Sequence, residues 1–239
     1  MNAFYDFRFL DKKPTDIDPL AHVKTRDVGI PEKVKLSESI PFANTTFDFS
    51  SIYGGQKYNE RTIKYVINVV GTDTGDQVTV HRIKTRLINW IMGANTKQPL
   101  YDDKYPDYYF LAEAQSNNSF EDDTYTGELT VSFTCYPFMI KRNAEGDDDW
   151  DSFDFDGGVA QSVDHVINGS NNIALINPSA TSVSCTVTIT GGPISLTVDG
   201  EKYELSAGIN TDIVLPNGNV NLLASGTGTI HFDWHREVI

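Results

Sequence analysis

Three side chains near the C-terminus have the chemistry of metal ligands. His231, Asp233 and His235 alternate with apolar residues, so a β-strand would project all three from the same face. Two imidazoles and one carboxylate are a ligand set that zinc accepts. A polar face on a terminal strand is usually solvated, while the intervening apolar side chains face a core. We therefore expect a solvated strand face here, and no metal.

Two acidic stretches are candidates for calcium binding. Glu121, Asp122 and Asp123 end a predicted turn that starts at Asn117, and a longer acidic run extends over residues 143–158. Neither stretch has the alternating Asp-x-Asp-x-Asp-Gly order of a calcium loop. We interpret the first as an exposed turn and the second as a hydrated, self-repelling linker.

No catalytic arrangement is recognisable. The chain shows no Ser-His-Asp order, nucleophile elbow, phosphate loop or HExxH motif. Carboxylates are numerous, but no pattern places two of them in a dry cleft, as a glycosidase requires. Cys135 and Cys185 fall in separate predicted domains and are interpreted as buried thiols. The sequence predicts a protein that is not an enzyme, with no catalytic, cofactor-binding or metal-binding residues and no cofactor.

Charge is distributed unevenly along the 239 residues, whose net charge is −14. Residues 1–142 contain 17 basic and 19 acidic side chains, whereas residues 143–239 contain 2 basic and 14 acidic ones. An acidic second half argues against binding to nucleic acid or to an anionic membrane. No signal peptide or membrane-spanning run is apparent. The change in composition predicts a domain over residues 1–142, a linker over 143–158 and a second domain over 159–239.

The stretch from Phe47 to Val70 organises the first domain. Phe47 and Phe49 alternate with polar residues, the pattern breaks at Gly54-Gly55, and a longer alternation follows. Period-two alternation predicts a strand with one buried face. Tyr58 and Arg61 lie where the chain enters this strand, and we expect the ring and the guanidinium to brace the turn. The residues predicted to be buried are Arg61, Ile63, Tyr65, Ile67 and Val69.

One helix is predicted, over Gln77 to Met92, with Asp76 as its N-cap. Its apolar residues recur with helical spacing, and its basic residues are interpreted as a solvated face. The segment from Lys12 to Pro31 is interrupted by proline and glycine, which predicts an irregular arm. The apolar stripe of the helix consists of Val80, Ile83, Leu87, Trp90 and Ile91.

The second domain is β-rich throughout. Eight short apolar runs are separated by turn signals such as Asp199-Gly200 and Asn217-Gly218, a pattern typical of a β-sandwich. The predicted strands are 163–167, 173–176, 183–189, 194–198, 202–205, 212–215, 220–223 and 229–234.

An ordered series of motifs resembles the distal tail proteins of siphophages. The series begins with Pro41-Phe42 and Phe47-Asp48-Phe49-Ser50 and covers about residues 40–138. A later Asn177-Pro178 and the turn at Asp199-Gly200 are similar to the galectin-like C-terminal domain of that family. The other motifs are Tyr58, Arg61, Tyr65, Asn89-Trp90-Ile91-Met92-Gly93, Leu100-Tyr101-Asp102, Tyr108-Tyr109 and Val131-Ser132-Phe133-Thr134-Cys135-Tyr136-Pro137.

The resemblance implies a mostly β fold: an N-terminal β-sandwich with one flanking α-helix, followed by a galectin-like β-sandwich. It also implies a structural role at the tail tip of the virion, after assembly in the host cytoplasm. Such a protein forms a ring, expected to be a hexamer, which connects the tail tube protein and the tape measure protein to a tail-associated lysin, baseplate or receptor-binding protein. Two alternatives remain, a carbohydrate-binding module for the host cell wall and a hydrolase. The ordered His-Asn-Arg set by which galectins bind sugar is not visible.

Overall fold

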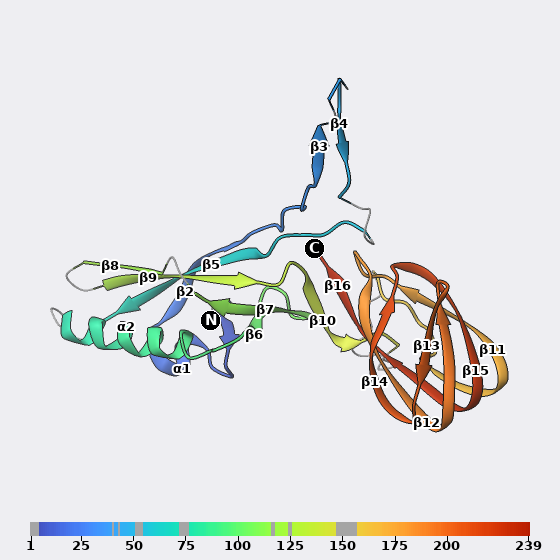
Figure 1. The fold of residues 1–239 in the computed structure, drawn as a ribbon. Helices are drawn as coiled ribbons and strands as arrows, with labels where there is room; N and C mark the ends of the chain where they lie inside the picture. Colours follow the sequence, from blue (N-terminus) through green and yellow to red (C-terminus); the bar gives the residue numbers. More distant parts are fainter. Residues whose placement is uncertain are drawn as a thin grey trace. The chain divides into compact units, whose positions relative to one another are not determined.

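The computed structural model describes residues 5–39, 41–42, 44–50, 55–71, 77–115, 118–123, 126–146 and 157–239 (Figure 1). Within these residues the chain forms two compact units. The first ends at Met139, and the second runs from Ile140 to Val238. None of the described helices is long and apolar enough to cross a membrane.

An antiparallel sheet forms the first unit, with strand order β1-β6-β7-β9-β5-β2 and with β8 beside β9. Its longest pairing joins β5 to β9 from Arg61↔Cys135 to Val70↔Thr126. The alternation predicted for β5 is confirmed, because every second side chain from Arg61 to Val69 is buried. The strands are β1 (Phe7–Phe9), β2 (His22–Val28), β5 (Arg61–Val70), β6 (Gln98–Asp102), β7 (Tyr108–Ala114), β8 (Ser119–Asp122) and β9 (Thr126–Cys135).

This sheet folds over on itself into two layers. The ring of Phe7 in β1 stacks on the ring of Tyr65 in β5, with 4.4 Å between centroids. Phe9 meets Phe133 of β9 edge to face at 5.1 Å. Since β1 and β5 are far apart in the strand order, these contacts require the sheet to curl. The predicted N-terminal β-sandwich is thereby confirmed.

The predicted helix is confirmed as α2 (Gln77–Ile91). All five residues of its predicted apolar stripe are buried in the core of the first unit. The indole N–H of Trp90 also donates a hydrogen bond to the carbonyl of Phe9 at 2.9 Å, which ties the helix to β1. Asp76, the expected N-cap, lies outside the described residues.

The prediction of an irregular arm from Lys12 to Pro31 is wrong. The segment contains a second helix, α1 (Pro14–Ile17), and the strand β2, which pairs with β5. Proline at the first position of a helix costs no hydrogen bond, so Pro14 starts α1 instead of preventing it. Gly29 and Pro31 come after β2 has ended. The breaking residues therefore mark the ends of short elements.

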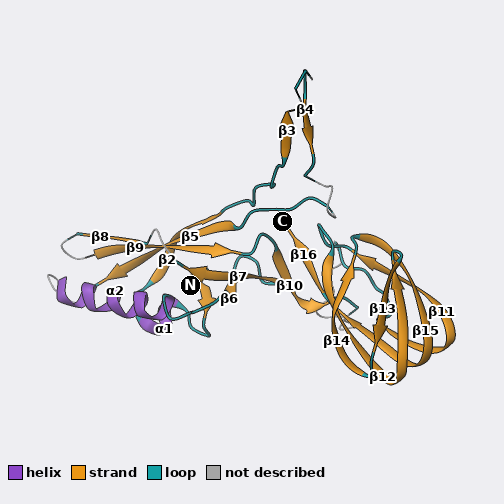
Figure 2. Ribbon diagram, in the orientation of Figure 1, coloured by secondary structure: helices purple, strands orange, loops and turns teal. Residues whose placement is uncertain are grey.

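A separate hairpin precedes β5. It consists of β3 (Ser37–Ser39) and β4 (Thr46–Asp48), which pair only with each other among the described strands (Figure 2). Phe47 therefore belongs to a two-stranded ribbon, and not to the strand that contains Tyr65.

The second unit is a β-sandwich of long, bent strands, so the prediction of eight short strands is wrong. Six of the predicted runs merge in pairs into β11, β12 and β15. The strand order is β11-β15-β12-β13, and β14 also pairs with β12. β10 pairs with β16 and runs to Ala144, past the expected domain limit at Arg142. The bounds are β10 (Met139–Ala144), β11 (Asp164–Asn177), β12 (Val183–Val198), β13 (Glu201–Leu205), β14 (Gly208–Leu215), β15 (Gly218–Asp233) and β16 (His235–Val238).

Glycines explain why these runs merge. Gly169 lies opposite Gly226 in the β11–β15 pair, and Gly191 lies opposite Gly228 in the β12–β15 pair. All four have positive φ, which glycine adopts without steric cost, so the strands bend there instead of ending. At Gly226 a Cβ atom would lie 2.6 Å from the carbonyl oxygen of Pro193.

Leu87→Ala should lower the free energy of unfolding by about 2–5 kcal/mol, because it leaves a cavity in the core of the first unit. Thermal or urea unfolding measures the change. The control is the exposed neighbour Arg86, whose replacement by alanine should change stability by less than about 0.5 kcal/mol. Equal effects of the two substitutions would show that the helix does not pack on the sheet.

Gly226→Ala should destabilise the second unit by more than about 3 kcal/mol, because a backbone clash adds to the strain of its φ of +146°. The control is Gly169→Ala, where φ is +90° and a Cβ would meet no atom within 4 Å. That variant should lose only about 1–2 kcal/mol. If both variants unfold at the same urea concentration, the bend does not depend on close backbone approach.

Candidate functional site

The three candidate zinc ligands are not brought together. His231 Nδ1 hydrogen-bonds to Asp164 at 2.9 Å, whereas His235 Nδ1 donates to the carbonyl of Lys141 at 2.8 Å. The apolar residues between them are buried in the core, as expected. Within the described part of the chain, no group of three or more acidic, histidine or cysteine side chains is arranged to hold a metal ion.

The other candidate residues from the sequence are the two acidic stretches and the two cysteines. The predicted turn from Asn117 to Asp123 is wrong, because Ser119–Asp122 form the strand β8, which pairs with β9. Asp122 pairs with His81 at 3.1 Å on the surface. Most of the acidic linker, residues 147–156, lies outside the described residues. Cys135 and Cys185 are buried thiols, as expected, and burial raises the pKa of each to about 12. Both thiols therefore stay protonated and unreactive at neutral pH.

Arg61 braces the chain, but with partners other than the one predicted. Its Nε donates to the carbonyl of Pro137 at 2.6 Å, and its guanidinium lies over the ring of Phe110 at 5.6 Å. Tyr58 packs against Phe138 instead. Burial lowers the pKa of Arg61. A carboxylate beside the guanidinium would offset the cost of burying its charge, but Arg61 contacts a carbonyl and an aromatic ring instead.

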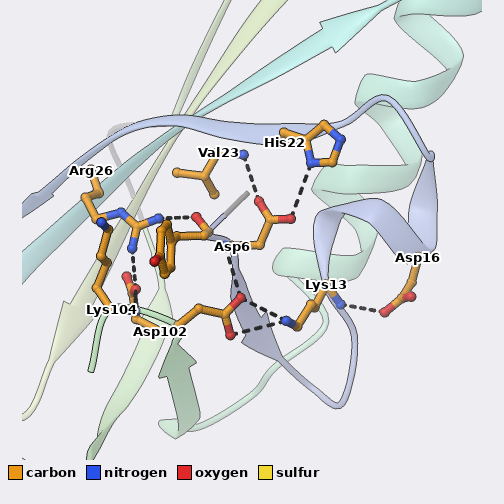
Figure 3. Close-up of polar contacts among 10 residues, drawn as sticks. Asp6, Lys13, Asp16, His22, Val23, Arg26, Asp102 and Lys104 are labelled. Atoms are coloured by element: carbon orange, nitrogen blue, oxygen red, sulfur yellow. Dashed lines mark hydrogen bonds and ion pairs between the residues drawn. The ribbon is translucent and has the colours of Figure 1, made fainter. Parts of the chain in front are cut away.

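A group of buried polar contacts, here called the closing cluster, connects the first and last strands of the sheet (Figure 3). At its centre Asp102, at the end of β6, has no exposed surface. Its carboxylate forms an ion pair with Arg26 of β2 and accepts hydrogen bonds from the Tyr65 hydroxyl and the Lys104 N–H, both at 2.8 Å. These contacts satisfy the buried charge from three directions.

Asp6, next to β1, makes a second connection to β2. Its carboxylate accepts a hydrogen bond from the Val23 N–H at 2.9 Å and lies 3.4 Å from His22 Nδ1. Arg26 contributes to this connection too: its Nη1 faces Asp102, and its Nη2 donates a hydrogen bond to the carbonyl of Tyr5. The two edge strands of the sheet, β1 and β2, are thus joined by side chains, where a barrel would use backbone hydrogen bonds.

The closing cluster holds strands of the first unit in position. Its acids and bases are paired with one another. The pKa of Tyr65 is raised above its ordinary value, first by burial and then by Asp102. Because the pKa is raised in the folded state, the contribution of Tyr65 to the free energy of unfolding is complete at neutral pH. It is lost as pH rises from the ordinary tyrosine pKa through the higher folded-state pKa. Because Arg26 and Asp102 are 76 positions apart, no local pattern could have predicted their pairing.

The β3–β4 hairpin is the clearest candidate for an interaction surface in the first unit. Leu36, Phe42 and Phe47 expose their side chains on it or at its tip. Phe42 is fully exposed and has a φ of +72°, which is unusual for a bulky residue. Lys35 pairs with Asp48 at 2.7 Å, and Lys35 together with Ser50 lowers the pKa of Asp48. Two-stranded ribbons are marginally stable alone, so a partner surface would stabilise this one.

A shallow groove of about 570 Å³ lies on the second unit. Asn172, Asn221, Leu223 and Asp199 contribute to its lining. Among the described residues no aromatic ring lines it, although ring stacking is a usual part of small-molecule sites. The groove therefore gives the carbohydrate-binding alternative no specific support.

Asp102→Ala should lower the free energy of unfolding by about 3–5 kcal/mol, because it leaves Arg26 largely buried without its carboxylate. Denaturant unfolding measures the loss. Glu128 is the control, because it pairs with Lys24 where both side chains are more than two-fifths exposed. Glu128→Ala should cost less than about 1 kcal/mol. A tolerated loss of Asp102 would show that the cluster does not close the sheet.

Comparison with known proteins supports the fold. No family model matches the sequence, and no curated protein matches it at a significant level. Among solved structures, the crystal structure of the SPP1 Dit protein (gp 19.1) is similar along the whole chain, with a TM-score of 0.68 and 14% identity. The alignment covers 99% of this chain and 100% of that one. SPP1 Dit is described as a paradigm of the hub adsorption apparatus in phages that infect Gram-positive bacteria. The chain therefore has the fold of a distal tail protein.

Proposed function

We propose that this protein is a distal tail component of a siphophage, a structural hub of the adsorption apparatus. The observation that carries the proposal is the match to SPP1 Dit over 99% of the chain, which includes both units. The ordered motifs between residues 40 and 138 support the same assignment. The role is architectural, in agreement with the paired charges of the closing cluster.

We infer that six copies form a closed ring through the first unit. A ring of identical subunits needs two different, complementary surfaces on each copy. The β3–β4 hairpin offers one of them, in place of the arm from Lys12 to Pro31. The near balance of charge in residues 1–142 favours close packing of copies, whereas the acidic remainder would repel its own copies at the ring centre.

In this proposal the ring links the tail tube protein and the tape measure protein to a baseplate, tail-associated lysin or receptor-binding protein. It does so at the tail tip of the virion, after assembly in the host cytoplasm. Neither a membrane nor nucleic acid is an expected partner, because the acidic part of the chain repels phosphate groups.

The full-length protein should have six times the 26.6 kDa mass of one chain when measured by light scattering. Replacing Phe42 and Phe47 with serine removes exposed apolar surface from the hairpin, and this variant should be monomeric with unchanged unfolding temperature. Val166→Ser removes a similarly exposed side chain from the second unit and should leave the ring intact. A monomeric wild type at high concentration would contradict the ring, and a hexameric hairpin variant would contradict the role of the hairpin.

A further inference from the structure

The exposed side of helix α2 is positively charged in an otherwise acidic chain. α2 contains one histidine, two arginines and one lysine and no acidic residue, although the whole chain has 33 acidic and 19 basic side chains. The helix lies along one side of the sheet of the first unit (Figure 2). Its exposed side, here called the outer face of α2, consists of Val78, His81, Arg82, Thr85, Arg86, Asn89 and the following Met92.

Only part of this positive charge is satisfied within the first unit. His81 Nε2 lies 3.1 Å from Asp122, and Lys84 Nζ lies 4.8 Å from the centre of the Phe120 ring, so both side chains contact β8. Arg82 and Arg86 have no ion pair, side-chain hydrogen bond or ring contact with any residue that the structure describes. They are the two described arginines that lack a local partner.

The stability of α2 itself does not explain these two arginines. Residues four positions apart lie one turn apart on a helix, with about 6 Å between their Cβ atoms. Two like charges at this spacing destabilise a helix, whereas an acidic residue at either position would stabilise it. Arg82 and Arg86 therefore carry an energetic cost in the isolated chain, and an anionic partner would remove that cost.

Apolar side chains flank the arginines on the same face. Val78 is 66% exposed and Met92 is 43% exposed. The N–H of Met92 donates to the carbonyl of Ile88 at 2.8 Å, so the helical spacing continues to Met92. Arginine and methionine are enriched in protein interfaces relative to the rest of a protein surface. The outer face of α2 thus has a cationic centre with an apolar side chain near each end.

This composition selects the chemistry of a partner. A guanidinium group binds carboxylate or phosphate through paired hydrogen bonds. Nucleic acid and anionic membranes carry extended negative charge, which the net charge of −14 on this chain repels. A protein segment needs negative charge only at the contact itself, because salt screens charges farther than about 8 Å away. A segment with two carboxylates between apolar side chains matches every part of the face.

We propose that the outer face of α2 docks an amphipathic, acidic segment of another protein. Two carboxylates of the segment face Arg82 and Arg86, and its apolar side chains contact Val78 and Met92. The contact does not use the β3–β4 hairpin, so it does not rest on the ring. Light scattering of the same sample reports the oligomeric state separately.

The test uses the full-length protein and a labelled, alanine-rich peptide that is stapled as a helix. The peptide is as long as α2 and carries two glutamates one turn apart, with a leucine on the same face near each end. Fluorescence anisotropy measures its affinity. Replacing both Arg82 and Arg86 with glutamate should weaken binding by roughly tenfold or more, because two attractions become repulsions. A peptide with lysines in place of the glutamates should prefer this double variant to the wild type by a similar factor.

A matched control separates the local contact from the net charge of the chain. Lys33 and Lys57 are also exposed and have no side-chain partner among the described residues. Replacing both with glutamate changes the net charge by the same amount as the double arginine variant does. This control should bind the glutamate peptide within about twofold of the wild type.

A single substitution separates binding from folding. Arg82→Glu places a carboxylate one turn before Arg86, an arrangement that stabilises a helix. This variant should bind the peptide more weakly than the wild type without unfolding at a lower temperature. The proposal is overturned by absence of saturable binding or by equal losses in the arginine and lysine double variants. Displacement of the peptide by inorganic polyphosphate or by phosphatidylglycerol vesicles, at an equal concentration of charge, would also overturn it.

Discussion

The first unit depends on one buried charge. Asp102 has no exposed surface, and it is stable there because Arg26, Tyr65 and a backbone N–H surround it. Removing two charges from water is costly, and only close pairing with additional hydrogen bonds offsets that cost. These partners come from β2, β5 and the turn after β6, so the charge is satisfied only when the sheet has curled. The stacked rings of Phe7 and Tyr65 then fill the space between the two layers.

In the second unit, bent strands produce the two-layer fold. Its long strands continue across the bend because paired glycines allow the backbones to approach closely. Each unit has a hydrophobic core of its own, and the β3–β4 hairpin exposes apolar side chains outside the core of the first unit.

Periodic features were predictable from the sequence, and long-range or ambiguous ones were not. Two periodic patterns each predicted which face of an element is buried, and the structure confirms both. They are the alternation from Arg61 to Val69 and the helical stripe that contains Leu87. Glycine is ambiguous, because it serves equally in a turn and in a bent strand. The sequence therefore predicts six separate strands where the structure has three bent ones. Pro14 gave a similarly ambiguous signal, since proline also starts helices. The closing cluster joins residues 76 positions apart and leaves no local pattern.

We propose that this chain forms a closed ring through its first unit. Electron cryomicroscopy of the purified full-length protein tests it most directly, because class averages report both closure and symmetry. We expect rings with sixfold symmetry in which the β3–β4 hairpin of each copy contacts its neighbour. Single particles of one chain, open filaments, or rings held together by the second unit would contradict it.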